Sequence, residues 1–153
     1  MAKQSAGILL YRLINNTPEL FLVHPGGPFW KNKDEGAWSI PKGEFTEEEN
    51  ALDAAIREFG EETGTKLSGK FIELTPIKQK SGKIVYAWAF EGDIDATKIV
   101  SNTFTMEWPP KSGKFQSFSE VDKAEWFTID AAKQKINSSQ ALLIDELIKK
   151  FSV

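Results

Sequence analysis

Three glutamates at helical spacing are the residues of this sequence with the clearest chemical potential. Glu58, Glu61 and Glu62 stand at positions i, i+3 and i+4, so a helix through them would bring their carboxylates together. Like charges at this spacing destabilise a helix by about 0.2–0.5 kcal/mol per pair. A divalent cation would convert that repulsion into ligation, and Mg²⁺ or Mn²⁺ suits a set of oxygen ligands. The spacing therefore predicts a metal site.

Neighbouring residues could support such a site. Arg57 can pair with Glu49 or Asp53, either to orient ligating carboxylates or as an ordinary helix salt bridge. Gly43 precedes the expected helix, and its carbonyl could approach a metal because no side chain obstructs it. Gly64 is expected to be the helix C-cap.

The spacing of these residues resembles the Nudix box, G-x5-E-x7-R-E-U-x-E-E-x-G-U, in which U is a bulky aliphatic residue. Every fixed position matches over residues 43–65. The first U is Phe59, which is aromatic but bulky and apolar, and the second is Thr65, a mild departure that keeps β-branching. At typical residue frequencies the seven fixed positions would match by chance on the order of once in 10⁸ starts. The sequence is therefore similar to the Nudix hydrolase family.

This resemblance implies a fold, a reaction and a ligand set. The implied fold is α/β, an α/β/α sandwich with a mixed sheet. The implied reaction is hydrolysis of a nucleoside diphosphate linked to another group, with a nucleoside triphosphate or dinucleoside polyphosphate as the expected small-molecule substrate. Glu58, Glu61 and Glu62 would hold Mg²⁺, with Mn²⁺ as an alternative, aided by the Gly43 carbonyl. The metal would neutralise the diphosphate and lower the pKa of an attacking water.

Residues 119–126 and 38–43 resemble stretches of diadenosine tetraphosphate hydrolases, and residues 24–30 and 107–118 are similar to a branch of predicted nucleoside triphosphate pyrophosphohydrolases. Glu120 lies six residues before Trp126, and we expect it to be a general base or an additional ligand, with Glu107 and Glu125 as rivals. Lys42, in the stretch WSIPKG, is a candidate phosphate contact or an exposed solubilising lysine.

Aromatic residues are candidates for binding a base. The diadenosine polyphosphate hydrolases usually carry a tyrosine at the position of Gly82, and Tyr86 is the candidate substitute. Aromatic residues that alternate along an expected strand, as Tyr86 does, are more often part of the core than of a binding site. An aromatic residue in an expected loop, such as Trp30, more strongly suggests contact with a base. The single histidine, His24, is expected to be a strand-end residue.

Composition limits the protein class. The chain has 153 residues, 41% of them hydrophobic and 27% charged, which is typical of one globular domain spanning residues 1–153. It has no cysteine, which excludes disulfides and cysteine chemistry. No apolar run is long enough to span a bilayer, and a cytoplasmic location is expected. Residues 44–62 carry a net charge of −7 and the remainder +4. The sequence does not predict an oligomeric state.

The order of the strands and helices that must position these residues favours one α/β domain with a mixed sheet and helices packed on it. A helix over residues 47–62 is expected, beginning at a Thr46 cap, with Leu52, Ala55, Ile56 and Phe59 facing the core and the three glutamates on a neighbouring face. The region 94–119 is expected to be irregular. The remaining predicted strands cover 5–14, 19–24, 37–40, 71–79, 83–91 and 124–127, and the first two should pair as a hairpin. A short helix capped by Thr128 or Asp130 and a final helix over 140–151 should follow, the latter with Leu143, Leu147 and Phe151 in the core.

Two other functions remain open. A Nudix-fold binding or regulatory module without turnover would be expected to have lost box glutamates, whereas this sequence retains all of them. Action on the triphosphate end of an RNA is compatible with the positive charge outside residues 44–62, but no run of basic and aromatic residues demands it.

Overall fold

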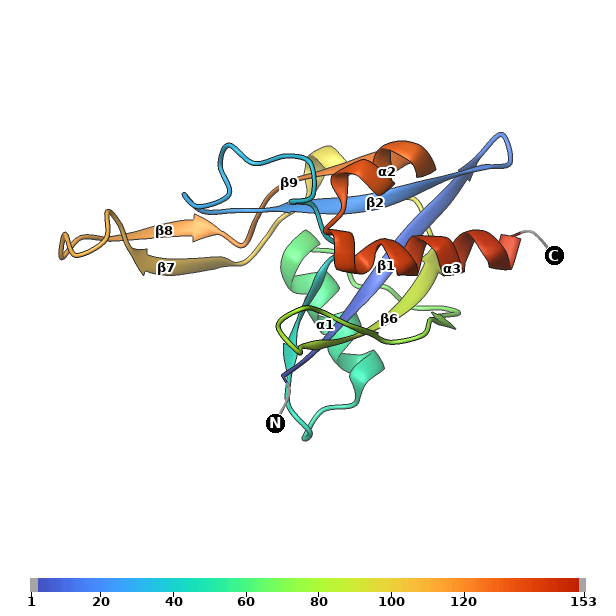
Figure 1. Cartoon of the computed structure of the whole chain (residues 1–153), viewed down its shortest axis with the longest axis horizontal. Helices are drawn as coiled ribbons and strands as arrows, with labels where there is room; N and C mark the ends of the chain where they lie inside the picture. Colours follow the sequence, from blue (N-terminus) through green and yellow to red (C-terminus); the bar gives the residue numbers. More distant parts are fainter. Residues whose placement is uncertain (1–2, 152–153) are drawn as a thin grey trace.

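A computed structural model describes residues 3–151 of the chain, which form nine strands and three α-helices (Figure 1). The strands are β1 (Gln4–Ile14), β2 (Thr17–Pro25), β3 (Lys42–Phe45), β4 (Ile72–Glu73), β5 (Ile77–Lys78), β6 (Ile84–Glu91), β7 (Thr103–Glu107), β8 (Phe115–Ser119) and β9 (Val121–Thr128). The helices are α1 (Ala51–Thr63), α2 (Ile129–Lys135) and α3 (Ala141–Phe151), with 3-10 turns η1 (Ala96–Lys98) and η2 (Ser138–Gln140). In this part of the chain no helix has the length and apolarity needed to cross a membrane.

The main sheet is mixed, as predicted, and has the order β4-β6-β1-β2-β9. In addition, β3 pairs with β1 and β5 pairs with β6. The β1–β6 pair is parallel, and the other pairs of this sheet are antiparallel. The predicted hairpin of β1 and β2 is confirmed, and its two turn residues, Asn15 and Asn16, have φ of 52° and 65°. Asparagine tolerates this left-handed conformation, which two-residue hairpin turns require.

A hydrophobic core lies on each face of the sheet. Successive residues of β1 point to opposite faces, so Leu9 and Tyr11 enter one core while Ile8 and Leu10 enter the other. The first core is closed by α2 and α3 through Ala132, Leu143, Ile144 and Leu147. The second is closed by α1 through Ala54, Ala55 and Phe59. This arrangement confirms the α/β fold with a mixed sheet and helices on both faces.

Helix α1 begins later than the sequence indicates. Its N-cap is Asn50, whose side chain accepts hydrogen bonds from the backbone N–H groups of Leu52 and Asp53. The predicted cap, Thr46, instead accepts the Glu49 N–H through its carbonyl in a preceding turn. The prediction of a helix from residue 47 was therefore wrong. The helix begins at Ala51, because the Asn50 side chain satisfies the first free backbone N–H groups at that point. The predicted C-cap is confirmed: Gly64 has φ of 82° and donates to the Gly60 carbonyl.

Other boundaries also differ from the predictions. Residues 37–40 form only isolated bridges, one of them between Ser39 and Val23, and residues 71–79 contain two short strands, β4 and β5. Phe151, expected in the core, is 38% exposed and packs edge-on against Tyr11.

The region 94–119, predicted to be irregular, contains the β7–β8 hairpin. This hairpin extends away from the main sheet (Figure 1). At its tip the Glu107 carboxylate accepts the backbone N–H groups of Lys111 and Gly113. These bonds order the turn of the hairpin. The prolines and glycine of this turn are typical of irregular segments, so the sequence did not indicate the two strands beside it.

Candidate active site

Helix α1 directs two of the three box glutamates into the protein. Glu58 and Glu62 are each 8% exposed, and Glu61 is half-buried. Glu58 and Glu62 therefore share the buried side of the helix with Ala54 and Phe59, and the expectation of a separate, adjacent face was wrong. The buried side is wide because α1 packs against β1 and also against β3.

Gly43 in β3 makes room for the Glu58 carboxylate. A Cβ atom built on Gly43 would overlap the carboxyl carbon and both carboxyl oxygens of Glu58. The position of β3 is in turn defined by its antiparallel pairing with β1, where Gly43 lies opposite Ala6. Position 43 therefore requires glycine because the Glu58 carboxylate lies where a Cβ atom would be, and not because of turn geometry.

We expect Gly43→Ala to lower kcat/KM by about 100-fold, because the added methyl group displaces Glu58 and misplacement by about 1 Å can have this effect. Steady-state kinetics at saturating Mg²⁺ would measure the loss. The matched control is Gly60→Ala, where a Cβ would meet only a Thr65 carbonyl oxygen at 3.7 Å. That variant should keep its activity and unfold at a slightly higher temperature, since alanine favours a helix. Equal activity of the two variants would contradict the assigned role of Gly43.

Arg57 links the carboxylates of the site. Its guanidinium forms two hydrogen bonds with Glu49, at 2.8 and 2.9 Å, and one each with Glu58 at 2.9 Å and Glu61 at 3.0 Å. Of the two partners considered from the sequence, Glu49 is the one that Arg57 contacts. The Glu49 hydrogen bonds and the nearby Glu58 charge raise the pKa of Arg57 above its ordinary value. The guanidinium therefore stays charged and holds the rotamers of Glu58 and Glu61.

Burial and mutual repulsion disfavour the charged forms of the carboxylates. Burial is the larger cause and Glu58 the next, and together they raise the pKa of Glu62 to about 9, although Lys42 opposes the shift. Burial and the charge of Glu61 raise the pKa of Glu58 to about 7. Burial and Glu61 also raise the pKa of Glu120. The site thus concentrates more negative charge than its cationic side chains neutralise.

The donor chemistry of this site suits a divalent cation. Its side chains offer only carboxylate oxygens, which Mg²⁺ and Mn²⁺ prefer, and a bound cation would relieve the repulsion that raises the pKa values of Glu58 and Glu62. In the described residues no three acidic or histidine side chains are already grouped around a common point. Arg57 bonds to one oxygen of Glu58 and one of Glu61, so each carboxylate can keep this bond and offer its other oxygen to a cation.

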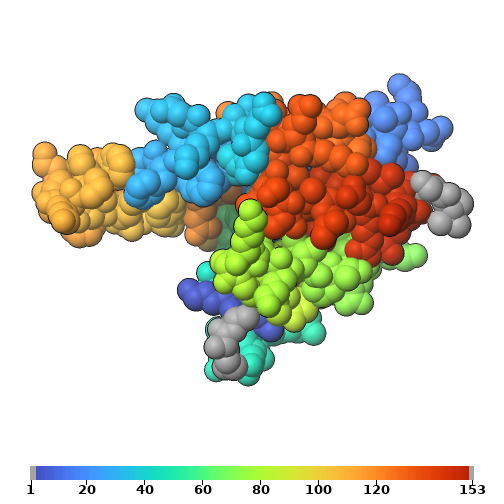
Figure 2. Space-filling view, viewed as in Figure 1, coloured from blue at the N-terminus to red at the C-terminus, as the bar shows by residue number. Residues whose placement is uncertain are grey.

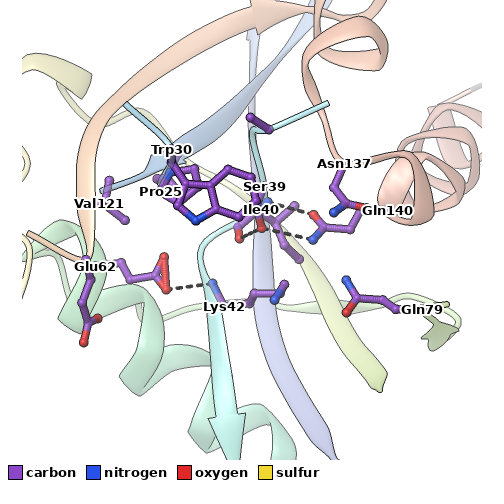
Figure 3. A pocket seen from close by; sticks show the side chains of 13 residues that line it. Pro25, Trp30, Ser39, Ile40, Lys42, Glu62, Gln79, Val121, Asn137 and Gln140 are labelled. Atoms are coloured by element: carbon purple, nitrogen blue, oxygen red, sulfur yellow. Dashed lines mark hydrogen bonds between the residues drawn. The ribbon is translucent and has the colours of Figure 1, made fainter. Parts of the chain in front are cut away.

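A pocket of about 330 Å³ lies beside the carboxylates (Figure 3). Its charged lining residues are Lys42, Glu62 and Glu120, so the structure brings three of the residues predicted from the sequence to one cavity. The Lys42 backbone N–H donates to the Glu62 carboxylate at 3.2 Å, the dashed line at the left of Figure 3. Burial and the charge of Lys83 lower the pKa of the Lys42 ammonium group.

Tyr86 does not line this pocket. Its ring packs against Phe45 with centroids 6.1 Å apart, and its hydroxyl accepts a hydrogen bond from the Gln4 carboxamide at 3.5 Å. Glu107, a rival to Glu120, lies at the tip of the β7–β8 hairpin, and Glu125 is exposed on β9.

The pocket also contains uncharged polar residues that no pattern in the sequence indicates. Gln140, which is 1% exposed, accepts the Ile40 N–H and donates to the Ser39 hydroxyl. Gln79 and Asn137 line the same cavity. No local pattern could have identified them, because they come from a turn after β5 and from the segment between α2 and α3, far apart in the sequence.

A model of the NUDIX domain matches residues 3–147. The chain belongs to the Nudix family. This match confirms the prediction of a Nudix pyrophosphohydrolase acting on nucleotides. A sequence comparison with curated proteins finds no significant match.

Solved structures of Nudix proteins share this fold. An Ap4A hydrolase from C. elegans, in a binary complex, has a TM-score of 0.63 at 20% identity, covering 99% of this chain and 98% of that one. The NUDIX domain of Shewanella oneidensis NrtR, complexed with ADP ribose, has a TM-score of 0.64 at 14% identity, with coverages of 98% and 88%. A MutT/nudix family protein from Listeria innocua has a TM-score of 0.64 at 16% identity, with coverages of 98% and 94%.

Proposed function

We propose that this Nudix protein, acting as one domain over residues 1–153, hydrolyses a pyrophosphate bond of a nucleoside triphosphate or dinucleoside polyphosphate with Mg²⁺. One observation carries the proposal: the buried Glu62 carboxylate of α1 lines a pocket of about 330 Å³ that also contains Lys42 and Glu120. An anionic polyphosphate cannot enter such an acidic site without a cation, and the Nudix box supplies oxygen ligands for one.

Each site residue has a proposed role. Glu58, Glu61 and Glu62 would hold the metal, with Mn²⁺ able to replace Mg²⁺, and the Gly43 carbonyl would complete the set. Bound there, the cation supplies charge neutralisation and lowers the pKa of a coordinated water.

The other residues position groups or move a proton. Arg57, itself oriented by Glu49, positions Glu58 and Glu61 through its hydrogen bonds. Glu120 accepts the proton of the attacking water or adds a ligand, because its raised pKa favours proton uptake. Lys42 contacts a substrate phosphate from the pocket as a point charge.

A substrate panel with Mg²⁺ tests the proposal. It would contain the four nucleoside triphosphates, diadenosine tetraphosphate, ADP-ribose and a 5′-triphosphorylated oligonucleotide, each with and without EDTA, with phosphate and nucleotide products resolved. We expect turnover of a triphosphate or a dinucleoside polyphosphate that EDTA abolishes. The names of the similar structures, with Ap4A hydrolase and bound ADP ribose among them, support nucleotides as the class to test. Preference for the oligonucleotide would favour an RNA-end enzyme, and binding without turnover would favour a non-catalytic module.

A further inference from the structure

We propose that the pocket continues, at the end away from Glu62, into a cationic groove that binds a further phosphate group of the substrate, beyond the diphosphate that is cleaved. This inference rests on the proposed function, because it assumes that the reacting diphosphate lies at the carboxylates. Figure 3 shows the Lys42 side chain extending away from Glu62 towards Gln79. The Lys42 ammonium group therefore lies between the carboxylates and the groove.

A second cavity, of about 540 Å³, forms the groove. It adjoins the pocket, because Gln79 and Asn137 line both cavities. In Figure 2 the yellow-green atoms of the turn after β5 lie against the orange-red atoms of the segment between α2 and α3, and β5 contacts η2. These two segments supply the other lining residues of the groove, which are Lys78, Lys80, Ser81, Ser138 and Ser139. Within residues 3–151 no acidic side chain lines it.

The lysines of this region lack ionic partners. Lys42, Lys78 and Lys80 form no ion pair with any residue that the structure describes. The neighbouring Lys83 does form one, with the Glu44 carboxylate at 3.3 Å. The groove and its entrance therefore hold more positive charge than the surrounding carboxylates neutralise, and an anion is the ligand that this excess favours.

The Lys42 ammonium group is the most shielded from water of these charges, since Lys78 and Lys80 are exposed. Burial and the charge of Lys83 lower the pKa of Lys42, although Glu62 and Glu44 attract its ammonium group without contacting it. A charge that leaves water without a partner raises the free energy of the folded protein. A phosphate oxygen at the entrance of the groove would supply the missing partner, because lysine binds phosphate as a point charge.

Two carboxamides offer further donors beside the lysines. The Asn137 side-chain oxygen accepts the N–H and the hydroxyl of Ser139, and its NH₂ group has no partner in the described part of the chain. The side chain of Gln79 has none there either. A phosphate group carries several strong acceptor oxygens, so it can bond to these donors and to the lysines together. A neutral sugar or nucleoside would leave the lysines unpaired.

Binding without turnover tests the groove itself. The dissociation constant of inorganic tripolyphosphate would be measured by calorimetry in EDTA on the wild type, Lys78→Gln and Lys80→Gln. Each substitution should raise Kd by about fivefold, the upper range for an exposed pair of opposite charges. The matched control is Lys70→Gln, at an exposed lysine outside both cavities. It should bind as the wild type does, and thermal unfolding would verify that every variant folds.

Turnover with Mg²⁺ distinguishes two sources of the phosphate group. The kcat/KM of adenosine 5′-tetraphosphate relative to ATP measures the effect of a longer polyphosphate chain. The kcat/KM of ADP-ribose 2′-phosphate relative to ADP-ribose measures the effect of a separate phosphate ester. We expect the wild type to prefer the phosphate-richer member of one pair, Lys80→Gln to reduce that preference by about fivefold, and Lys70→Gln to retain it.

The two proposals fail in different ways. Equal tripolyphosphate affinity of the wild type, Lys78→Gln and Lys80→Gln would overturn the groove, and so would the absence of a preference in both substrate pairs when nucleotides are hydrolysed. Lysine-dependent binding of tripolyphosphate by a protein that hydrolyses nothing would support the groove and refute the proposed function only.

Discussion

Replacing Glu62 by glutamine should lower kcat by about 1000-fold, the scale on which loss of one charge-stabilising group acts in an active site. Glutamine has nearly the same shape and can still accept the Lys42 N–H that Glu62 accepts at 3.2 Å, so the fold should survive. The carboxamide cannot supply the negative charge that we assign to metal binding. Glu61→Gln should have a similar effect. Steady-state kinetics over a range of Mg²⁺ concentrations would measure both losses.

The control for these variants is Glu48→Gln, at an exposed acidic residue that precedes α1. It removes one negative charge from the same acidic stretch and should leave kcat within about twofold, because exposed charges interact weakly in water. Near-normal activity of Glu61→Gln or Glu62→Gln with Mg²⁺ would show that these carboxylates do not hold the cation.

The same Glu62→Gln change should stabilise the metal-free protein at pH 8 by up to about 5 kcal/mol, because pH 8 lies about 3.5 units above the ordinary pKa of 4.5 and each unit corresponds to about 1.4 kcal/mol. The pKa of Glu62 is raised from 4.5 to about 9 in the folded state, so folding disfavours its charged form. Below pH 4.5 the carboxyl is protonated in both states and adds no cost. As the pH rises from 4.5 towards 9, the unfolded chain loses its proton first, and the wild type becomes less stable relative to the variant.

Denaturant unfolding at pH 5 and pH 8 in EDTA would measure this difference, which should be small at pH 5 and larger at pH 8. Saturating Mg²⁺ should reverse this order of stability. A cation that binds only the folded state stabilises the wild type by mass action, and the variant binds it less tightly because it lacks one coordinating carboxylate. A variant that is less stable than the wild type in EDTA at pH 8 would contradict the raised pKa assigned to the buried Glu62 carboxyl group.

Local chemistry of the sequence was sufficient for the catalytic class and for several elements. The three carboxylates, Arg57 and the spacing of the box are properties of one helix and its flanks, where neighbours in sequence are neighbours in space. For the same reason the Gly64 cap and the β1–β2 hairpin could be predicted, since caps and tight turns depend on a few consecutive residues.

The tertiary structure decided which groups face one another. The burial of Glu58 depends on the absence of a side chain at Gly43 in β3, and periodicity within the helix could not show this contact. The pocket joins the segment before β3 to residues 100 positions away, as in the hydrogen bond between Ile40 and Gln140. Such contacts arise from the pairing and packing of distant segments, whose geometry is determined only when the whole sheet assembles. The sequence therefore determined the reactive groups, and the fold determined the cavity in which a substrate meets them.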